Sequence, residues 1–585
     1  MRTLRLIWSV TRGGATVTVL LLLIESALFL ASVYVFRLLI DVIVKSPAGS
    51  TEKSTLVIQY LLVAGATTVL YVILRSVTSL ISEIQASKVS QHIDDKIHAC
   101  ATDLDLAFYE SPAYFDTMKR ARDAGPERPN AIFINLVDIA KNGLMLAVMG
   151  SLLISINWLL LPLLAVFILP TLMVRIRFAG KMYKWKMQQT PVERKASYLS
   201  SLITGDTSAK EVKAFGLGNY LRNLYTGIRS QLLTDRLRIT RKTSLNESIT
   251  TVLATLCLFT CIAFICISTL KGNTTVGDVT VFLVVFPQLF HLMNALSVGI
   301  SGLYQNSIFI SNLYELFDLR ATLKEPEQPL PVPQTKNADL SIETLSFTYP
   351  HAKETTLHNI NLRIPAGKIV AVVGLNGAGK TTLIKLLARL YDPSAGKISM
   401  CGTDIRRFKS DEYRSQVSVV FQDFGRYNVS AADNIRFGDI DGLRAADDIK
   451  EAAIASGADE FIKKFPDGYN TIMGRVFEDG REVSIGQWQK LAIARAFYSN
   501  SRFIILDEAT SALDAKAEQE LFELFRDNIG ERGVLIISHR LSAVKHADHI
   551  YVMSEGKITQ HGTHEELVSV PGEYAKLFMK KVVIV

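Results

Sequence analysis

The sequence predicts two dissimilar parts, an all-α transmembrane domain of six long helices followed by an α/β domain. Three observations support this division. The chain has 585 residues, which is too long for one ordinary domain. Its hydrophobic residues, 49% of the total, concentrate in the first half as runs long enough to cross a bilayer. The second half has the mixed composition of a soluble domain, with short β-branched runs typical of buried strands.

The first half contains six apolar runs near the length of a membrane-spanning helix, about 20 residues. They lie near 16–38, 56–80, 139–156, 158–178, 248–270 and 277–300. The first run follows a basic N-terminus, but it is longer than the apolar core of a cleavable signal and lacks a small-residue cleavage site. We therefore expect it to be retained as a membrane span.

Lysine and arginine predict how these spans are oriented. The N-terminal segment and the two long stretches 81–130 and 179–247 are rich in basic residues, whereas the connectors 45–54 and 271–276 hold few. Positive charge accumulates on the cytoplasmic side of a membrane protein. The N-terminus, both long stretches and the second half are thus expected in the cytoplasm, with the spans in the plasma or inner membrane. This distribution also accounts for the net charge of +8, so no nucleic-acid partner is expected.

The two long basic stretches are too hydrophilic for the bilayer and are predicted to continue the spans as helices. Turn-forming residues interrupt them near 111–118 and near 206–216, where we expect short transverse helices that couple to a domain below. The transmembrane domain then covers 1–321, and a proline-rich linker covers 322–337. The remaining residues, 338–585, are enough to bury a core of their own.

A phosphate-binding loop follows a predicted buried strand, 368–373, and precedes a predicted helix. The loop fits the pattern G-x-x-x-x-G-K-[ST] and consists of Gly374, Leu375, Asn376, Gly377, Ala378, Gly379, Lys380, Thr381 and Thr382. Backbone N–H groups of such a loop surround phosphate oxygens, the lysine contacts the β- and γ-phosphates, and the Ser/Thr hydroxyl binds Mg²⁺. The sequence therefore predicts a site for ATP and Mg²⁺, with Lys380 also serving catalysis.

Two adjacent acids end a second predicted strand, 503–506. An aspartate at this place in a phosphate-binding-loop protein holds Mg²⁺, the role expected of Asp507. The next residue, Glu508, is placed to act as the general base that polarises an attacking water. Hydrolysis of ATP is the reaction that this pair predicts.

Further motifs resemble those of the ABC ATPases. The stretch 483–489 resembles the family's LSGGQ signature, and the other matching motifs are its D-loop, switch histidine, Q-loop and adenine-stacking aromatic. The residues concerned are Ser484, Ile485, Gly486 and Gln487 of the signature; Ser511, Ala512, Leu513 and Asp514 of the D-loop; His539 in ISHR; Gln422 in FQDF; and Tyr349 in SFTYP. The resemblance covers 338–585, and the first half resembles the six-helix domain of ABC exporters by layout.

The resemblance implies a cytoplasmic ATPase domain with an antiparallel β subdomain and a helical subdomain. It implies that Gln422 contacts Mg²⁺ and that His539 acts in catalysis near the γ-phosphate. In this family the signature of one domain completes the ATP site of another, so a dimer is expected. The partner is a second copy of this chain or, alternatively, a related half-transporter.

One departure from the family pattern concerns the signature. Ile485 replaces the first glycine of its Gly-Gly pair, and Val483 replaces its leucine. A β-branched residue is stiffer than glycine. We therefore expect an active site whose turnover is altered.

The cargo is less sharply predicted. Glu25 in the first span, and Gln288, His291 and Asn294 in the sixth, either contact cargo in a cavity or hydrogen-bond between helices. The signature GQWQ and the QDF of the Q-loop resemble exporters of ribosomally made peptides such as lantibiotics. The expected function is ATP-driven peptide export from a lipid membrane; alternatives are export or flipping of lipids or hydrophobic drugs, or an ATP-gated membrane protein that does not transport.

Overall fold

The chain folds as two compact units, Met1–Asp103 with Ala113–Leu319, and Leu104–Pro112 with Arg320–Val585. The structure, a computed structural model, describes residues 2–44, 51–111, 117–118, 127–156, 158, 160–271, 275–333, 335, 338–350, 352–440, 442, 446–509, 519, 523, 526–538, 540 and 544–582.

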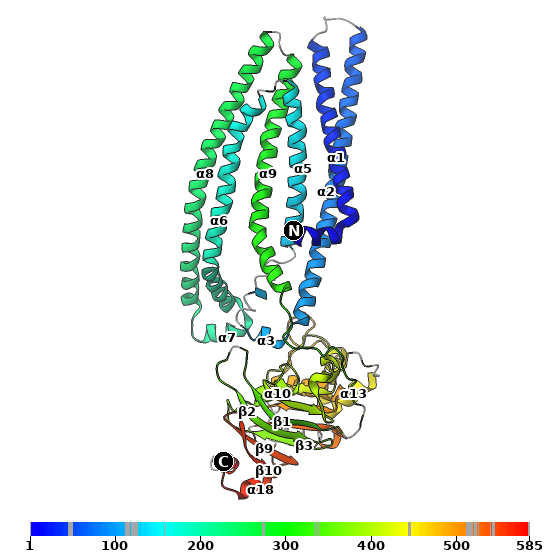
Figure 1. Ribbon diagram of the computed structural model, residues 1–585, viewed down its shortest axis with the longest axis vertical. Coiled ribbons are helices and arrows are strands. Elements are labelled where there is room, and N and C mark those ends of the chain that lie inside the picture. The colour runs from blue at the N-terminus through cyan, green and yellow to red at the C-terminus, as the bar shows by residue number, and fades with distance from the viewer. Residues whose placement is uncertain are drawn as a thin grey trace. The chain divides into compact units, whose positions relative to one another are not determined.

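Within the residues that the structure describes, the first unit contains six long helices, as predicted. They are α1 (Arg2–Val44), α2 (Thr51–Asp103), α5 (Glu127–Ile156), α6 (Leu160–Thr204), α8 (Gly218–Leu270) and α9 (Val276–Phe317). Helices α1 and α2 lie side by side, as do α5 and α9, and α6 and α8 (Figure 1). With lengths of 30 to 53 residues, most of these helices are longer than a bilayer crossing needs. Their polar ends therefore extend beyond the membrane.

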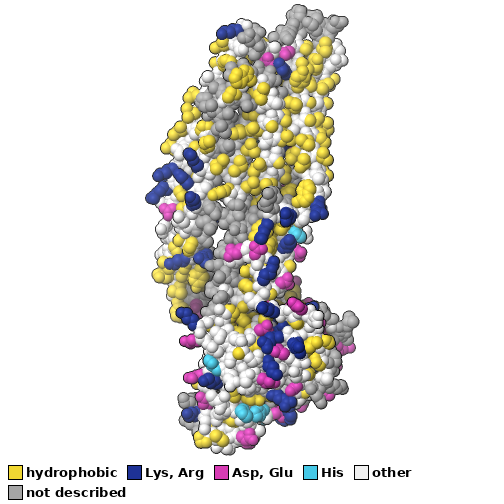
Figure 2. Space-filling model, viewed as in Figure 1, with side chains coloured by type: hydrophobic (Ala, Val, Ile, Leu, Met, Phe, Trp, Pro, Cys, Tyr) yellow, Lys and Arg dark blue, Asp and Glu magenta, His cyan; other side chains and the backbone are white. Residues whose placement is uncertain are grey.

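Among the described residues, four of these helices carry stretches apolar and long enough to span a membrane: Trp8–Ile43, Ser54–Asp103, Ala131–Ser151 and Val276–Tyr304. Helix α8 contributes a shorter apolar stretch, Phe259–Leu270. The expected fourth span, 158–178, falls mostly within α6, and most side chains of this span are outside the described residues. Hydrophobic side chains cover the surface over α1 and α2 (Figure 2). Such a surface requires lipid around it, so this is an integral membrane protein.

The start of α9 is tied to α1 by polar contacts. Thr275 caps α9 in a capping box with Asp278. Asp278 also pairs with Arg37 of α1 at 2.6 Å, and Asp41 accepts the backbone N–H of Gly277 at 3.1 Å. Residues 275–279, TVGDV, thus form a helix start that contacts α1.

A six-stranded sheet forms the centre of the second unit, in the order β10-β9-β3-β8-β7-β6. All neighbours are parallel except the β9–β10 pair. The strands are β3 (Ile369–Val373), β6 (Val417–Val420), β7 (Phe503–Asp507), β8 (Gly533–Ile537), β9 (His549–Ser554) and β10 (Lys557–Gly562). Every residue of β3, β7 and β8 is buried, which explains their β-branched composition.

A separate four-stranded sheet, in the order β2-β1-β4-β5, is antiparallel throughout. Its strands are β1 (Leu340–Phe347), β2 (Leu357–Ile364), β4 (Ala395–Met400) and β5 (Thr403–Asp404). A helical part contains α12 (Ala431–Arg436), α13 (Ala446–Ala455), α14 (Asp459–Ile462) and α15 (Ile485–Tyr498), which share one apolar core. The predicted α/β domain with antiparallel and helical subdomains is confirmed.

Short helices lie in or beside the two interruptions of the long stretches. Helix α7 (Asp206–Ala214) fills the second interruption. Near the first, helix α3 (Leu106–Tyr109) ends just before the expected segment, most of which, 112–116, is outside the described residues. The proline-rich stretch after α9 belongs to the second unit, and its buried Val332 packs into an apolar core of that unit.

Candidate active site

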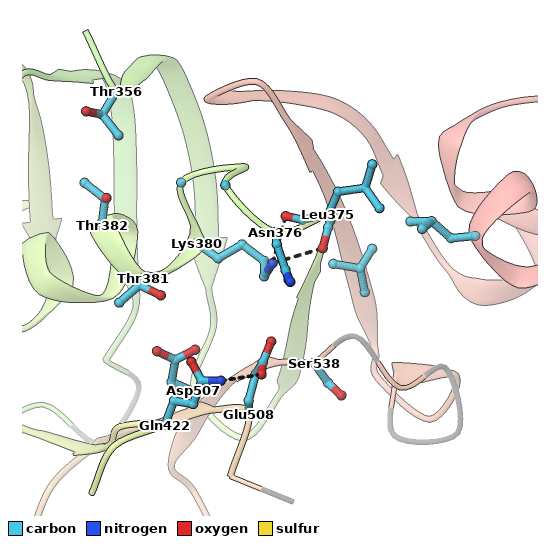
Figure 3. A pocket seen from close by; sticks show the side chains of 15 residues that line it. Thr356, Leu375, Asn376, Lys380, Thr381, Thr382, Gln422, Asp507, Glu508 and Ser538 are labelled. Atoms are coloured by element: carbon cyan, nitrogen blue, oxygen red, sulfur yellow. Dashed lines mark hydrogen bonds between the residues drawn. The ribbon is translucent and has the colours of Figure 1, made fainter. Parts of the chain in front are cut away.

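The phosphate-binding loop leaves the carboxyl end of β3, and Asp507 and Ser538 lie at the carboxyl ends of β7 and β8. Because these strands are parallel and adjacent, their ends meet at one edge of the sheet. There they line a cavity of about 930 Å³ together with Gln422 and Glu508 (Figure 3). Helix α10 (Lys380–Leu387) begins at the same place and directs its N-terminus at the cavity.

The glycines of the loop are required by its geometry. Gly379 has φ of +97°, a left-handed conformation, and a Cβ there would lie 2.6 Å from Cδ2 of Leu357. A Cβ on Gly374 would overlap the carbonyl oxygen of Met553. The loop can therefore pass close to the sheet and turn its backbone N–H groups toward a phosphate.

Lys380 lies across this loop. Its Nζ donates to the carbonyl oxygens of Gly374 at 2.9 Å and Leu375 at 3.1 Å. Burial lowers the pKa of Lys380, and the carboxylates of Glu508 and Asp507 oppose that shift. The ammonium group is thus a desolvated charge, which interacts more strongly with phosphate than an exposed lysine does.

Asp507 is a buried carboxylate, with 2% of its surface exposed. Its Oδ2 has no hydrogen-bond partner among the described residues. Burial, reinforced by the neighbouring Glu508, raises the pKa of Asp507 to about 6. A buried, unpartnered carboxylate oxygen is costly, and a divalent cation removes that cost.

Asp507, Thr381 and Gln422 could hold such a cation, since they line one cavity. In the described part of the chain, no three His, Cys, Asp or Glu side chains gather into a metal site. Proteins commonly bind Mg²⁺ through one or two carboxylates together with the phosphates of the substrate, and Asp507 is such a carboxylate beside a phosphate-binding loop.

Glu508 follows β7 in a left-handed conformation, with φ of +48°. Non-glycine residues rarely adopt this conformation, and its cost is tolerated mainly at functional sites. The backbone N–H of Glu508 donates to the carbonyl of Ile537 at 2.9 Å, and Gln422 Nε2 donates to Glu508 Oε2 at 3.0 Å. The turn projects the carboxylate into the cavity (Figure 3), where it could accept a proton from water.

Tyr349 lies beside the cavity but is not among the residues that line it. Its hydroxyl is 3.0 Å from Thr382 Oγ1, and its ring packs edge-on against Phe347 and Tyr391. The structure therefore places Tyr349 next to the last residue of the predicted phosphate-binding loop.

The signature residues form the start of α15. Ser484 is the N-cap, accepting the N–H of Gln487 at 3.2 Å, while Gln487 Oε1 accepts the N–H of Ser484 at 2.9 Å. Ile485 is 54% exposed, whereas Val483 belongs to the apolar core, where a valine can replace leucine. Ser484, Ile485, Gly486 and Gln487 do not line the cavity of their own chain.

The predicted D-loop, 511–514, and His539 lie outside the described residues. Four residues that line the cavity were not predicted as site residues: Thr356, Val373, Ser538 and Leu577. Ser538 directly precedes the predicted switch histidine and could have been found from that motif. Thr356 and Leu577 come from distant stretches that carry no motif.

The polar residues of the membrane unit fall into two groups. The carboxylate of Glu25 is 1% exposed and pairs with Lys141 of α5 at 2.9 Å, so it faces a neighbouring helix. Gln288 and His291 are exposed on α9, and Asn294 on the same face is partly exposed. Glu25 is therefore buried in an ion pair between helices, whereas the three polar residues of α9 are accessible on one face of that helix.

The fold and cavity define a class, a phosphate-binding-loop ATPase fused to membrane-spanning helices. Residues 357–511 match the family described as "ABC transporter", and residues 130–293 match "ABC transporter transmembrane region". The chain is 30% identical to the subtilin transport ATP-binding protein SpaT of Bacillus subtilis, over 98% of this chain and 93% of that protein. It belongs to the ABC transporter family.

Another relative is named for a lipid. The chain is 29% identical to the ATP-dependent lipid A-core flippase of Salmonella typhimurium, over 90% of this chain and 89% of that protein. A solved structure of a bacterial Atm1-family ABC exporter with ATP bound has the same fold, with a TM-score of 0.81 at 23% identity, covering 98% of this chain and 99% of that one. The protein is an ATPase whose hydrolysis of ATP drives export across a membrane.

Proposed function

We propose that this protein exports a ribosomally made peptide from the cytoplasm, working as a homodimer with two ATP sites. The exposed, pre-formed signature at the start of α15 carries the dimer proposal. Ser484 and Ile485 are exposed and lie outside the cavity of their own chain. A helix start with an exposed cap is a binding site for an anion, and the phosphate of an ATP held by a second copy fits it. One chain contains the motifs that an ATP site needs, including Glu508, so a second copy is sufficient as the partner.

The peptide proposal rests on the exposed face of α9. Gln288, His291 and Asn294 lie along this face, inside a stretch apolar enough to span a membrane. Polar side chains are costly against lipid, so we place this face on a cavity between two copies. Amide and imidazole groups there can hydrogen-bond to a peptide backbone. The similarity to the subtilin transport protein supports the same cargo class.

Hydrolysis in this proposal uses the cavity residues as follows. Lys380 and the N–H groups of the phosphate-binding loop neutralise the charge that develops on the transferred phosphoryl group. Asp507, Thr381 and Gln422 would hold Mg²⁺, which would neutralise negative charge on the phosphates. Glu508 orients the attacking water and accepts its proton, while Gln422 holds the Glu508 carboxylate in place.

The dimer closes and reopens because ATP has a higher affinity for its closed state than for its open state. ATP binds between the loop of one copy and the signature of the other only when the two ATPase units meet, so it favours the closed dimer. Hydrolysis removes that preference and reopens the dimer. The basic stretches support a cytoplasmic position for the N-terminus and the ATPase unit, so in this proposal closure moves cargo outward.

The cargo is tested by ATP hydrolysis in lipid nanodiscs, with lantibiotic-type peptides, lipids and hydrophobic drugs added one at a time. We expect a peptide to stimulate hydrolysis while lipids and drugs do not. Stimulation by a lipid or a drug alone would replace the peptide proposal with flipping or drug export.

A variant on α9 separates cargo contact from general effects. His291→Ala should raise the peptide concentration needed for half-maximal stimulation and leave unstimulated hydrolysis unchanged. Val284→Ala, an exposed apolar residue on the same face, is the matched control and should respond like wild type. Equal shifts in both variants would contradict a polar cargo contact.

A further inference from the structure

The segment Leu104–Pro112, which directly follows α2 in the chain, is part of the ATPase unit. Leu106 and Ala107 pack against the apolar core that includes β1 and β3. Asp105 accepts hydrogen bonds from the hydroxyl of Thr322 at 2.8 Å and from the N–H of Leu323 at 2.8 Å. The segment is therefore anchored by both apolar and polar contacts.

Glu110, at the end of this segment, makes two further contacts with the ATPase unit. Its Oε1 accepts from Lys385 Nζ at 2.5 Å, and its Oε2 accepts from the hydroxyl of Tyr391 at 2.7 Å. The side chains of Glu110 and Lys385 are 37% and 18% exposed. Each oxygen of one carboxylate thus binds a different partner, in a partly desolvated place where charge-assisted hydrogen bonds are strong.

Both partners of Glu110 touch Tyr349. The Lys385 Nζ lies 5.5 Å from the centre of the Tyr349 ring, within cation–π distance. The Tyr391 ring meets the Tyr349 ring edge-on, with centroids 5.4 Å apart and an angle of 84°. The hydroxyl of Tyr349 reaches Thr382, a residue of the phosphate-binding loop.

Electrostatics supports Lys385 and Tyr391 as the proton donors in these contacts. Burial lowers the pKa of Lys385, but its contacts with Glu110 and Tyr349 together outweigh that effect and the pKa is raised overall. The pKa of Tyr391 is raised by burial and by Glu110. Both side chains are held as donors to the carboxylate across the physiological pH range.

We propose that Glu110 is a positioning residue for the adenine end of the ATP site: by holding Lys385 and Tyr391, it fixes the Tyr349 ring and couples the base to the segment after α2. This rests on the adenine-stacking role of Tyr349 in the proposed function. A base that stacks on Tyr349 meets a ring whose position depends on Lys385 and Tyr391, and through them on Glu110. Coupling of this kind is reciprocal, so loss of Glu110 must change the affinity for the base.

The test is the equilibrium affinity of the full-length protein in nanodiscs for ATP and for inorganic triphosphate, which has no base, measured without cargo. Four proteins are compared: wild type, Glu110→Gln, Tyr349→Ala and the double variant. We expect Glu110→Gln to weaken ATP binding about three- to tenfold and to leave triphosphate binding unchanged. In the Tyr349→Ala background, Glu110→Gln should have no further effect on ATP.

The controls separate positioning from stability. Glu343→Gln removes a partly exposed ion pair with Lys397 in the same unit and should not change ATP affinity. Tyr391→Phe keeps the ring and removes the hydroxyl, so it should reproduce part of the Glu110→Gln effect. Because binding is measured directly, a loss of folded protein lowers the number of sites and not the affinity of those that remain.

Different results would contradict the positioning role of Glu110 and the adenine-stacking role of Tyr349. Equal weakening of ATP and triphosphate, or an effect of Glu110→Gln that persists with Tyr349→Ala, overturns the proposal for Glu110. Unchanged ATP affinity in Tyr349→Ala alone instead overturns the adenine-stacking role of Tyr349. Neither result depends on the identity of the cargo.

Discussion

Replacing Asp507 by asparagine is expected to stabilise the nucleotide-free protein while it abolishes hydrolysis. Asp507 is nearly fully buried at the end of β7, and burial raises its pKa from 3.8 to about 6. The folded state therefore holds a proton on this group more tightly than the unfolded state does. As pH rises from about 4 to about 6, stability falls, and above the folded pKa the whole penalty is present.

The size of this penalty follows from the shift. A rise from 3.8 to about 6 corresponds to about 3 kcal/mol at neutral pH. Asp507→Asn removes the charge and keeps the shape, so it should recover up to about 3 kcal/mol. For a unit of this size, that corresponds to a rise of roughly 6–12 °C in the unfolding midpoint.

The assay is thermal unfolding of purified protein in detergent, with EDTA and no nucleotide, between pH 4 and pH 8. We expect the gain of the variant over wild type to be large at pH 7.5 and to vanish near pH 4. Glu412→Gln, an exposed carboxylate on α11 (Ser410–Arg414), is the control and should show no such difference. A variant that is less stable than wild type at pH 7.5, or a gain independent of pH, would refute the reasoning.

Three other changes test separate parts of the structure. Lys141→Met leaves the buried Glu25 carboxylate without its partner and should cost about 3 kcal/mol in stability; the double variant with Glu25→Gln should recover most of it, and no recovery in thermal unfolding would argue against the pair. Gly379→Ala places a Cβ against Leu357 at a positive φ and should weaken ATP binding more than about tenfold, so near-wild-type affinity in a binding assay would exclude this loop geometry. Ser484→Ala removes the cap of α15, which costs about 1 kcal/mol; it should reduce hydrolysis while leaving ATP binding to the isolated protomer unchanged, and a loss of that binding would contradict a site completed by a second copy.

The parts that could be predicted from the sequence depend on local patterns. The phosphate-binding loop and the Asp507–Glu508 pair each follow a β-branched run, and parallel strands bring such ends together. The capping box of α15 is also local, since Ser484 and Gln487 are three residues apart. These features required no knowledge of distant contacts.

The contacts that the sequence did not predict join distant residues. Lys141 pairs with Glu25 across two helices, and nothing near either residue identifies the other as its partner. Glu110 was part of a turn pattern, but its hold on Lys385 and Tyr391 depends on how the segment after α2 folds back onto the sheet domain. Tertiary packing decides which distant side chains meet, and neither hydrophobic periodicity nor turn-forming residues predict it.

The central claim, ATP hydrolysis by Glu508-activated water, is tested most directly by measuring phosphate release from Mg-ATP in nanodiscs, wild type beside Glu508→Gln. The variant keeps the size of the side chain and loses the proton acceptor. We predict a fall of at least about a hundredfold in the rate, with ATP still bound at wild-type affinity. A Glu508→Gln rate close to that of wild type would contradict the account.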